Sequence, residues 1–358
     1  AGDDSYQLVM THVYYDVANL ITSNSLRDFN EFESINLEAE YWNKSLMNDL
    51  AINDKMYCGY NDFCLANCYV VAFNKDMVKD YASSIGDLYQ QVRDKEWTME
   101  KLIEYSSLVS RDNGDGQWDD QDTYGFSCWA WVPLISFQIG CDIPIVKSDD
   151  SGLYLSPMKD NADKITALDQ MLYDFMHMES TYNYVPAGFQ GNTTALKITS
   201  GRVMFELTSN FGLVNTKEED VKVGVLPYPL WDTKQENYKT LNWNGVLVIP
   251  TTVKNMDMVG DVMEMLAWYS EPVNTAFYET LLGAKVADAP EDVEMLQIIW
   301  STQVSDIGLV FSSSSNQMDC ILYAIPHHIS AGRPAYATYY KSNQRTAEKL
   351  LNAMFDEK

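Results

Sequence analysis

The stretch Tyr69-Val70-Val71-Ala72-Phe73, followed by Asn74-Lys75-Asp76, decides the fold of this chain. A short, unbroken apolar run that stops at a polar turn is typical of a strand buried on both faces of a sheet. Further runs of this kind lie at residues 6–10, 203–207, 222–226 and 245–249, and prolines follow the last two. The sequence therefore predicts several short, buried strands.

Segments with helical periodicity separate these strands. In residues 162–178, the apolar side chains of Ile165, Leu168 and Leu172 lie along one face of a predicted helix. A second helix is predicted over residues 97–109. Strands and helices alternate through the first two thirds of the chain, and the last third is predicted to be mostly helical. This order is typical of α/β proteins, in which helices cover parallel sheets.

Composition excludes several classes of protein. The 358 residues include 51 acidic and 25 basic side chains, a net charge of −26, which repels nucleic-acid phosphates. We therefore expect no nucleic acid as a partner. The sequence holds no apolar run of the roughly 18 residues that a membrane span needs. The six cysteines lack the paired spacing of a zinc site, and we expect them to be free, buried thiols.

Residues 111–122 form an acidic loop that is similar to a twelve-position calcium loop. Gly116 occupies the sixth position, where such loops turn sharply, but Arg111 occupies the first, where a carboxylate belongs. We expect this loop to bind calcium weakly or not at all, and we expect no other cofactor. The residues that would supply oxygen ligands are Asn113, Asp115, Asp119 and Asp122.

Catalytic motifs are missing from the sequence. It contains four histidines, but no HExxH, GxSxG or P-loop pattern surrounds them or any serine. Paired carboxylates of the glycosidase kind are defined by their separation in space, which a sequence does not give. We expect the protein not to be an enzyme.

A series of stretches gives a more specific indication by its order along the chain. These are Tyr6-Gln7-Leu8-Val9, Phe73-Asn74-Lys75-Asp76, Glu96-Trp97-Thr98, Asn113-Gly114-Asp115-Gly116 with Tyr124-Gly125, Ser200-Gly201-Arg202-Val203-Met204-Phe205 with Ser209-Asn210-Phe211, and Gly224-Val225-Leu226-Pro227. Together they resemble the family 1 extracellular solute-binding proteins of bacterial ABC importers, of the Gram-positive type, which are relatives of maltodextrin-binding proteins. The resemblance runs along essentially the whole chain.

This resemblance implies a two-lobed, periplasmic-binding-protein-like α/β fold of type II with a helix-rich C-terminal third. It predicts one lobe from residues 1–74 and 250–288 and a second lobe from residues 77–247 and 291–358. The chain would cross between the lobes near residues 74–75, 249–250 and 288–290. Members of the family begin with a strand, a helix and a second strand before the first stretch quoted above. This sequence starts almost at that stretch, so the N-terminal part of the first lobe is expected to be truncated.

The resemblance also implies a ligand site between the lobes, beyond the strand ends, where aromatic rings and amides are the expected contacts. The function it implies is an extracellular receptor, lipid-anchored at the cell surface, that delivers a carbohydrate to ABC permease subunits and acts as a monomer. The alternatives are a peptide or polyamine ligand, a secreted glycan-active enzyme, or a surface interaction protein without a small ligand. The candidate ligand-binding residues are His12, Tyr14, Tyr15, Asn61, Asp62, Trp129, Trp131, Gln190, Asn210, Phe211, Trp243 and Asn244.

Overall fold

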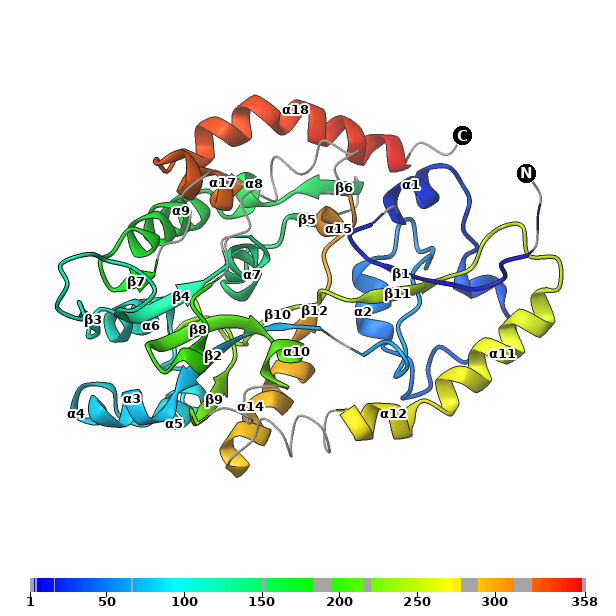
Figure 1. Ribbon diagram of the computed structural model, residues 1–358. Helices are drawn as coiled ribbons and strands as arrows, with labels where there is room; N and C mark the ends of the chain where they lie inside the picture. Colours follow the sequence, from blue (N-terminus) through cyan, green and yellow to red (C-terminus); the bar gives the residue numbers. More distant parts are fainter. Residues whose placement is uncertain are drawn as a thin grey trace.

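The protein has a mixed α/β fold with two lobes, seen side by side in Figure 1. No helix among the described residues is both long and apolar enough to cross a membrane. The computed structural model describes residues 3, 5–15, 17–65, 67–129, 131–149, 152–182, 195–214, 220–277, 289–311 and 324–355.

The smaller lobe is built around an antiparallel pair of strands, β1 and β11. Val9 pairs with Val248 and His12 with Gly245, and Gly59 forms an isolated bridge to Leu247. Among the described residues, β11 is the one strand that pairs with β1. The elements of this lobe are β1 (Val9–His12), α1 (Val17–Thr22), the 3-10 helix η1 (Phe29–Glu31), α2 (Lys44–Asp49), β11 (Gly245–Val248), α11 (Met256–Trp268) and α12 (Glu271–Thr275).

The larger lobe contains a six-stranded sheet in the order β3-β4-β8-β2-β9, with β7 paired to β4. Separate from it, β5 and β6 form an antiparallel hairpin. The elements of this lobe are β2 (Tyr69–Asn74), α3 (Lys75–Asp80), α4 (Ala82–Ile85), α5 (Leu88–Arg93), α6 (Met99–Ser106), β3 (Ser110–Arg111), β4 (Thr123–Cys128), α7 (Val132–Gly140), β5 (Val146–Asp149), β6 (Gly152–Leu155), α8 (Pro157–Asp160), α9 (Ala162–Met176), β7 (Thr181–Tyr182), the 3-10 helix η2 (Ile198–Ser200), β8 (Val203–Ser209), α10 (Asn210–Leu213) and β9 (Val223–Leu226).

The strand that decides the fold is buried as its sequence predicts, but its direction differs from the prediction. Residues 70–73 of β2 are buried, and Asn74 accepts hydrogen bonds from the backbone of Asp76 and Met77 and so caps α3. The sequence predicts parallel sheets, whereas β2 is antiparallel to β8 and β9, and β4 and β8 are parallel. The chain enters β2 directly from the smaller lobe and needs no crossover helix, so antiparallel pairing is open to it.

Strand pairing moves two of the expected lobe boundaries. Because β2 pairs with β8 and β9, residues 69–74 lie in the larger lobe, and the first crossing precedes β2 instead of following Asn74. Because β11 pairs with β1, residues 245–248 lie in the smaller lobe, and the second crossing precedes β11. A buried apolar run shows that a strand lies in a sheet, but not which sheet it joins. Of the third expected crossing, residue 288 lies outside the described residues.

The C-terminal third is mostly helical, and its part after α12 packs on the larger lobe. It contains α14 (Pro290–Ser301), β12 (Gln303–Val304), α15 (Ile307–Val310), α17 (Ala324–Ala331) and α18 (Tyr336–Phe355), and β12 pairs in parallel with β10 (Thr240–Leu241) between the lobes. Asp169 on α9 fixes the last helices: its carboxylate accepts the backbone N–H groups of Ala335 and Tyr336 and faces His328 Nδ1 at 3.1 Å. The helix-rich final third is therefore confirmed.

A buried carboxylate holds α14 against the larger sheet. Asp292 is fully buried and pairs with Lys75 Nζ at 2.6 Å. Tyr89 Oη donates a hydrogen bond of 2.5 Å to the same carboxylate, and the backbone N–H of Val225 in β9 donates a longer one of 3.4 Å. One side chain of α14 thus connects α3, α5 and β9.

We expect Asp292→Ala to lower the free energy of unfolding by about 3–5 kcal/mol, because it leaves the Lys75 ammonium without its buried partner. Glu294→Ala on the same helix is the matched control. It removes the half-exposed pair with Arg93, and we expect it to cost about 1 kcal/mol or less. Urea denaturation of both variants measures the difference, and equal losses would contradict the role given to Asp292.

Candidate functional site

Six of the predicted aromatic residues form one cluster. His12 ends β1, Tyr14 and Tyr15 follow it, and Trp243 precedes β11, so the pairing of β1 with β11 brings these rings together. The centroid of the Trp243 ring lies 5.0 Å from that of His12 and 5.3 Å from that of Tyr14. These distances fall in the range of direct ring contact. The aromatic cluster consists of His12, Tyr14, Tyr15, Trp129, Trp131 and Trp243.

The aromatic cluster spans both lobes. Trp129 follows β4, and Trp131 directly precedes α7 in the larger lobe. The two indole rings lie 5.6 Å apart, and Trp131 meets Tyr14 of the smaller lobe edge-on at 6.5 Å. The three tryptophans are half-buried and Tyr15 is 61% exposed, so the rings keep surface that a ligand can contact. Packing inside one lobe would have buried them fully.

The histidine of the cluster is a neutral ring. Its Nδ1 accepts the backbone N–H of Tyr14 at 3.1 Å, which places the remaining ring proton on Nε2. Burial lowers the pKa of His12 below its usual value of 6.5. At neutral pH the cluster therefore offers uncharged aromatic faces, together with the polar edges of histidine, tyrosine and tryptophan.

Two predicted amides form hydrogen bonds with the backbone near the chain crossings. Asn210 is buried, and its Oδ1 accepts the backbone N–H groups of Cys68 and Phe211. Asn244 is also buried, and its Nδ2 donates to the carbonyl of Cys64 at 3.0 Å. Both bonds hold the segment that leads into β2: Asn210 joins it to the end of β8, and Asn244 joins it to the segment before β11. Their role in ligand binding stays a prediction, and Gln190 lies outside the described residues.

Phe211 makes a second aromatic contact between the lobes. It is the second residue of the short helix α10 in the larger lobe and is 41% exposed. Its ring lies 5.1 Å from the ring of Phe277, which follows α12 in the smaller lobe. The sequence did not single out Phe277, because a phenylalanine in a predicted helix carries no signal beyond burial.

Asn61 and Asp62 line a cavity that also contains residues from the larger lobe. Asn61 Oδ1 accepts the backbone N–H of Phe63, and Asp62 accepts a hydrogen bond from Asn274 Nδ2 at 2.9 Å. Burial raises the pKa of Asp62. Asn242 lines the same cavity, although sequence reasoning passed over it. Its neighbours Trp243 and Asn244 were selected because they precede the second expected lobe crossing, and the same reason applied to Asn242.

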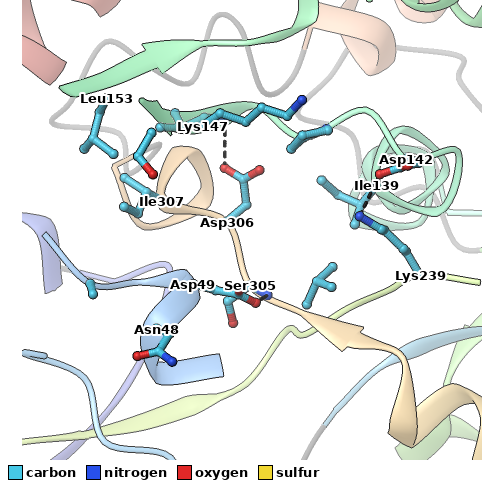
Figure 2. A pocket seen from close by; sticks show the side chains of 15 residues that line it. Asn48, Asp49, Ile139, Asp142, Lys147, Leu153, Lys239, Ser305, Asp306 and Ile307 are labelled. Atoms are coloured by element: carbon cyan, nitrogen blue, oxygen red, sulfur yellow. Dashed lines mark hydrogen bonds and ion pairs between the residues drawn. The ribbon is translucent and has the colours of Figure 1, made fainter. Parts of the chain in front are cut away.

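A pocket of about 360 Å³ lies where the segment between β12 and α15 meets both lobes, and Figure 2 shows its residues. The backbone N–H of Ser305 donates to Asp49 of α2 in the smaller lobe at 2.9 Å. The next residue, Asp306, accepts backbone N–H groups of the larger lobe from Ile145 at 2.7 Å and from Val146 at 3.3 Å. These bonds fix the segment between β12 and α15 to each lobe in turn.

Asp306 makes this pocket sensitive to pH. Its burial raises the pKa from 3.8 to about 7, against the opposing effect of the backbone hydrogen bonds it accepts. The folded protein therefore keeps a proton that the unfolded chain releases near pH 4. The stability that this proton contributes is fully present below the unfolded pKa and is lost as the pH rises through the folded value of about 7.

We expect the melting temperature of the wild-type protein, relative to that of Asp306→Asn, to fall as the pH rises from about 4 to about 8. The variant cannot titrate at this position, so subtracting its curve removes the contribution of the other carboxylates. Differential scanning calorimetry at several pH values measures the difference. A difference that stays constant across the range would show that Asp306 does not retain its proton on folding.

The acidic loop is closed by its own backbone. Asp122 is fully buried, and its two oxygens accept the backbone N–H groups of Asn113 at 2.8 Å and Asp119 at 2.7 Å. Asp115 accepts the N–H of Gln117 in the same way. Within the described parts of the chain, no group of three or more His, Cys, Asp or Glu side chains could hold a metal ion. Five cysteines, at positions 58, 64, 68, 128 and 141, are free and buried.

Calcium binding by the acidic loop stays a prediction, and we expect no affinity tighter than about 10⁻⁴ M. Arg111 removes one carboxylate from the ligand set, and Asp122 already uses both oxygens for the backbone. Calorimetric titration of calcium into chelator-treated protein tests this expectation. Micromolar affinity would mean that the loop rearranges around the ion.

Comparisons with known proteins bear on the fold. No family model matches the sequence, and no curated protein matches it significantly. Among solved structures, the maltose/maltodextrin-binding domain MalE from Bdellovibrio bacteriovorus, bound to maltotriose, is similar to it with 14% identity and a TM-score of 0.61, covering 97% of this chain and 85% of that one. UgpB from Mycobacterium tuberculosis, in complex with glycerophosphocholine, matches with 14% identity and a TM-score of 0.64, over 98% and 85% of the two chains.

The sugar-binding protein MalE from Xanthomonas citri matches with 10% identity and a TM-score of 0.62, over 97% of this chain and 84% of that one. At such identities the likeness extends to the arrangement of the elements and not to individual side chains. The chain has the two-lobed α/β fold of periplasmic sugar-binding proteins.

Proposed function

We propose that the protein is an extracellular solute-binding receptor that captures a carbohydrate between its lobes and passes it to an ABC importer. The observation that carries this proposal is the aromatic cluster, because it joins both lobes through the contact between the buried ring of Tyr14 and the half-buried ring of Trp131. Aromatic faces pack against the apolar faces of sugar rings, while hydroxyl and amide groups bind at their edges. The solved structures with this fold hold maltotriose in one case and glycerophosphocholine in another.

The proposed mechanism is binding without catalysis. A ligand seated on the half-buried rings of Trp243 in the smaller lobe and Trp131 in the larger lobe would contact both lobes, so binding would favour the orientation in which the two lobes are close. The permease subunits would then recognise that orientation. We propose that the receptor acts as a monomer at the cell surface, held there by a lipid anchor.

A cationic solute is the second candidate. The neutral rings of the cluster, whose centroids lie 5.0–6.5 Å apart, can attract a quaternary or protonated amine by cation–π interaction. The net charge of −26 also favours cations over anions. Glycerophosphocholine and spermidine therefore belong in the ligand screen beside maltotriose and other glycans. A response to the amines alone would replace the carbohydrate proposal with this one.

We expect Trp131→Ala to weaken glycan binding about tenfold or more, because it removes the ring through which the larger lobe contacts the ligand. Trp268→Ala is the matched control, since Trp268 lies on α11 of the smaller lobe, is 58% exposed, and lies outside the cluster. A thermal-shift screen identifies the ligand, and calorimetry then measures both variants. The proposal fails if no glycan raises the melting temperature, or if both substitutions weaken binding equally.

A further inference from the structure

The hinge segment Asn242-Trp243-Asn244 has two faces. It connects β10 to β11, and successive side chains of an extended segment point to opposite sides. Trp243 points to the aromatic cluster. Asn242 lines a different cavity, and Asn244 bonds to Cys64, which lines that cavity too. The segment therefore separates the aromatic cluster from a second space on its other side.

This second space, which we call the amide cavity, has a volume of about 520 Å³ and walls from both lobes. Asn61 and Asp62 contribute from the smaller lobe. Trp300 contributes from α14 and Gln303 from β12, which belong to the helical third packed on the larger lobe. A molecule in the amide cavity would touch both lobes, as a ligand of the aromatic cluster would.

Several buried polar atoms of this cavity have no hydrogen-bond partner among the residues that the structure describes. Asn242 is 1% exposed, and neither its Oδ1 nor its Nδ2 is hydrogen-bonded. Asn61 is 4% exposed and uses its Oδ1 for the backbone of Phe63, which leaves its Nδ2 unpaired. Gln303 Oε1 is also unpaired. Burying an amide without a hydrogen bond raises the free energy of the folded protein, so we expect these groups to bind a partner inside the cavity.

The chemistry of the lining defines that partner. Asn242 offers both a donor and an acceptor whichever way its amide is turned, Asn61 adds a donor and Gln303 adds an acceptor. Asp62 is the one charged side chain among the described lining residues, and it is already bonded to Asn274. A bound molecule must therefore both donate and accept hydrogen bonds, and it needs no charge.

We propose that the amide cavity is a second solute site, which binds a small neutral polyhydroxylated molecule. Hydroxyl groups satisfy this lining because each one donates and accepts, and the rings of Tyr60 and Trp300 supply an apolar wall. An anion is excluded by the Asp62 carboxylate. Because the walls come from both lobes, occupancy of this site would change the affinity of the aromatic cluster, and the reverse would also hold.

The test uses the full chain and myo-inositol as the probe, with glycerol 3-phosphate as an anionic comparison. Ligand-observed NMR and calorimetry are expected to detect binding of myo-inositol at about 10 mM or below and none of glycerol 3-phosphate. Asn242→Leu should weaken this binding at least tenfold. It removes an amide that no protein group uses, so the fold should be kept, and Gln303→Leu supplies an independent second variant.

Trp131→Ala separates this proposal from the proposed function. It should leave myo-inositol binding unchanged, while weakening glycan binding at the aromatic cluster. The second site is refuted if the wild-type protein does not bind myo-inositol, since the amides then contact water alone. It is also refuted if both leucine variants bind as the wild type does, or if Trp131→Ala abolishes binding. The last result would place the polyol at the aromatic cluster and support the receptor function.

Discussion

Ser305 and Asp306 fix the relation of the two lobes, because these adjacent residues, which connect β12 to α15, bind different lobes. The N–H of Ser305 is bound by Asp49 of the smaller lobe, and Asp306 binds the backbone at Ile145 and Val146 of the larger lobe. The parallel pair of β10 and β12 lies beside them. Backbone N–H groups that are buried between the lobes must find hydrogen-bond acceptors, and here the carboxyl groups of Asp49 and Asp306 accept them. The distance between Tyr14 and Trp131 depends on these bonds, since the two rings belong to different lobes.

The sequence was most informative about the candidate site where an aromatic residue lies next to the end of a predicted strand. His12, Tyr14 and Trp243 were selected as aromatic residues near strand ends, and the pairing of β1 with β11 brings them into contact. Their meeting with Trp131 followed from the resemblance to a two-lobed family, because no local pattern relates residues so far apart. The fold class and the helix-rich final third were predicted for the same reasons: periodicity is local, and the order of the motifs supplied the global arrangement.

The residues that sequence reasoning missed act through tertiary contacts. In the sequence, Asp306 is typical of a helix cap, and it does cap α15 by accepting the N–H of Gly308. Its hydrogen bond with the backbone of Ile145 joins residues 161 positions apart, which no local pattern predicts. The wrong direction and lobe of β2 have a similar origin, since an apolar run specifies burial without specifying neighbours. Asn210 and Asn244 were chosen as amides near strand ends, and their bonds to the chain crossings show that the same position also suits a structural role.

The two lobes differ in how much of their stability comes from contacts within the lobe itself. The larger lobe has a six-stranded sheet covered by helices, whereas the smaller lobe, in its described residues, has one strand pair supplemented by isolated bridges. A two-stranded ribbon is marginal by itself and relies on what packs against it. The exposed apolar side chains of α11, among them Val262 and Met265, contribute little burial to it. The smaller lobe therefore depends strongly on its contacts across the hinge. A ligand that bridges the lobes would add contacts where the smaller lobe has fewest, so ligand binding and the folding of this lobe should be strongly coupled.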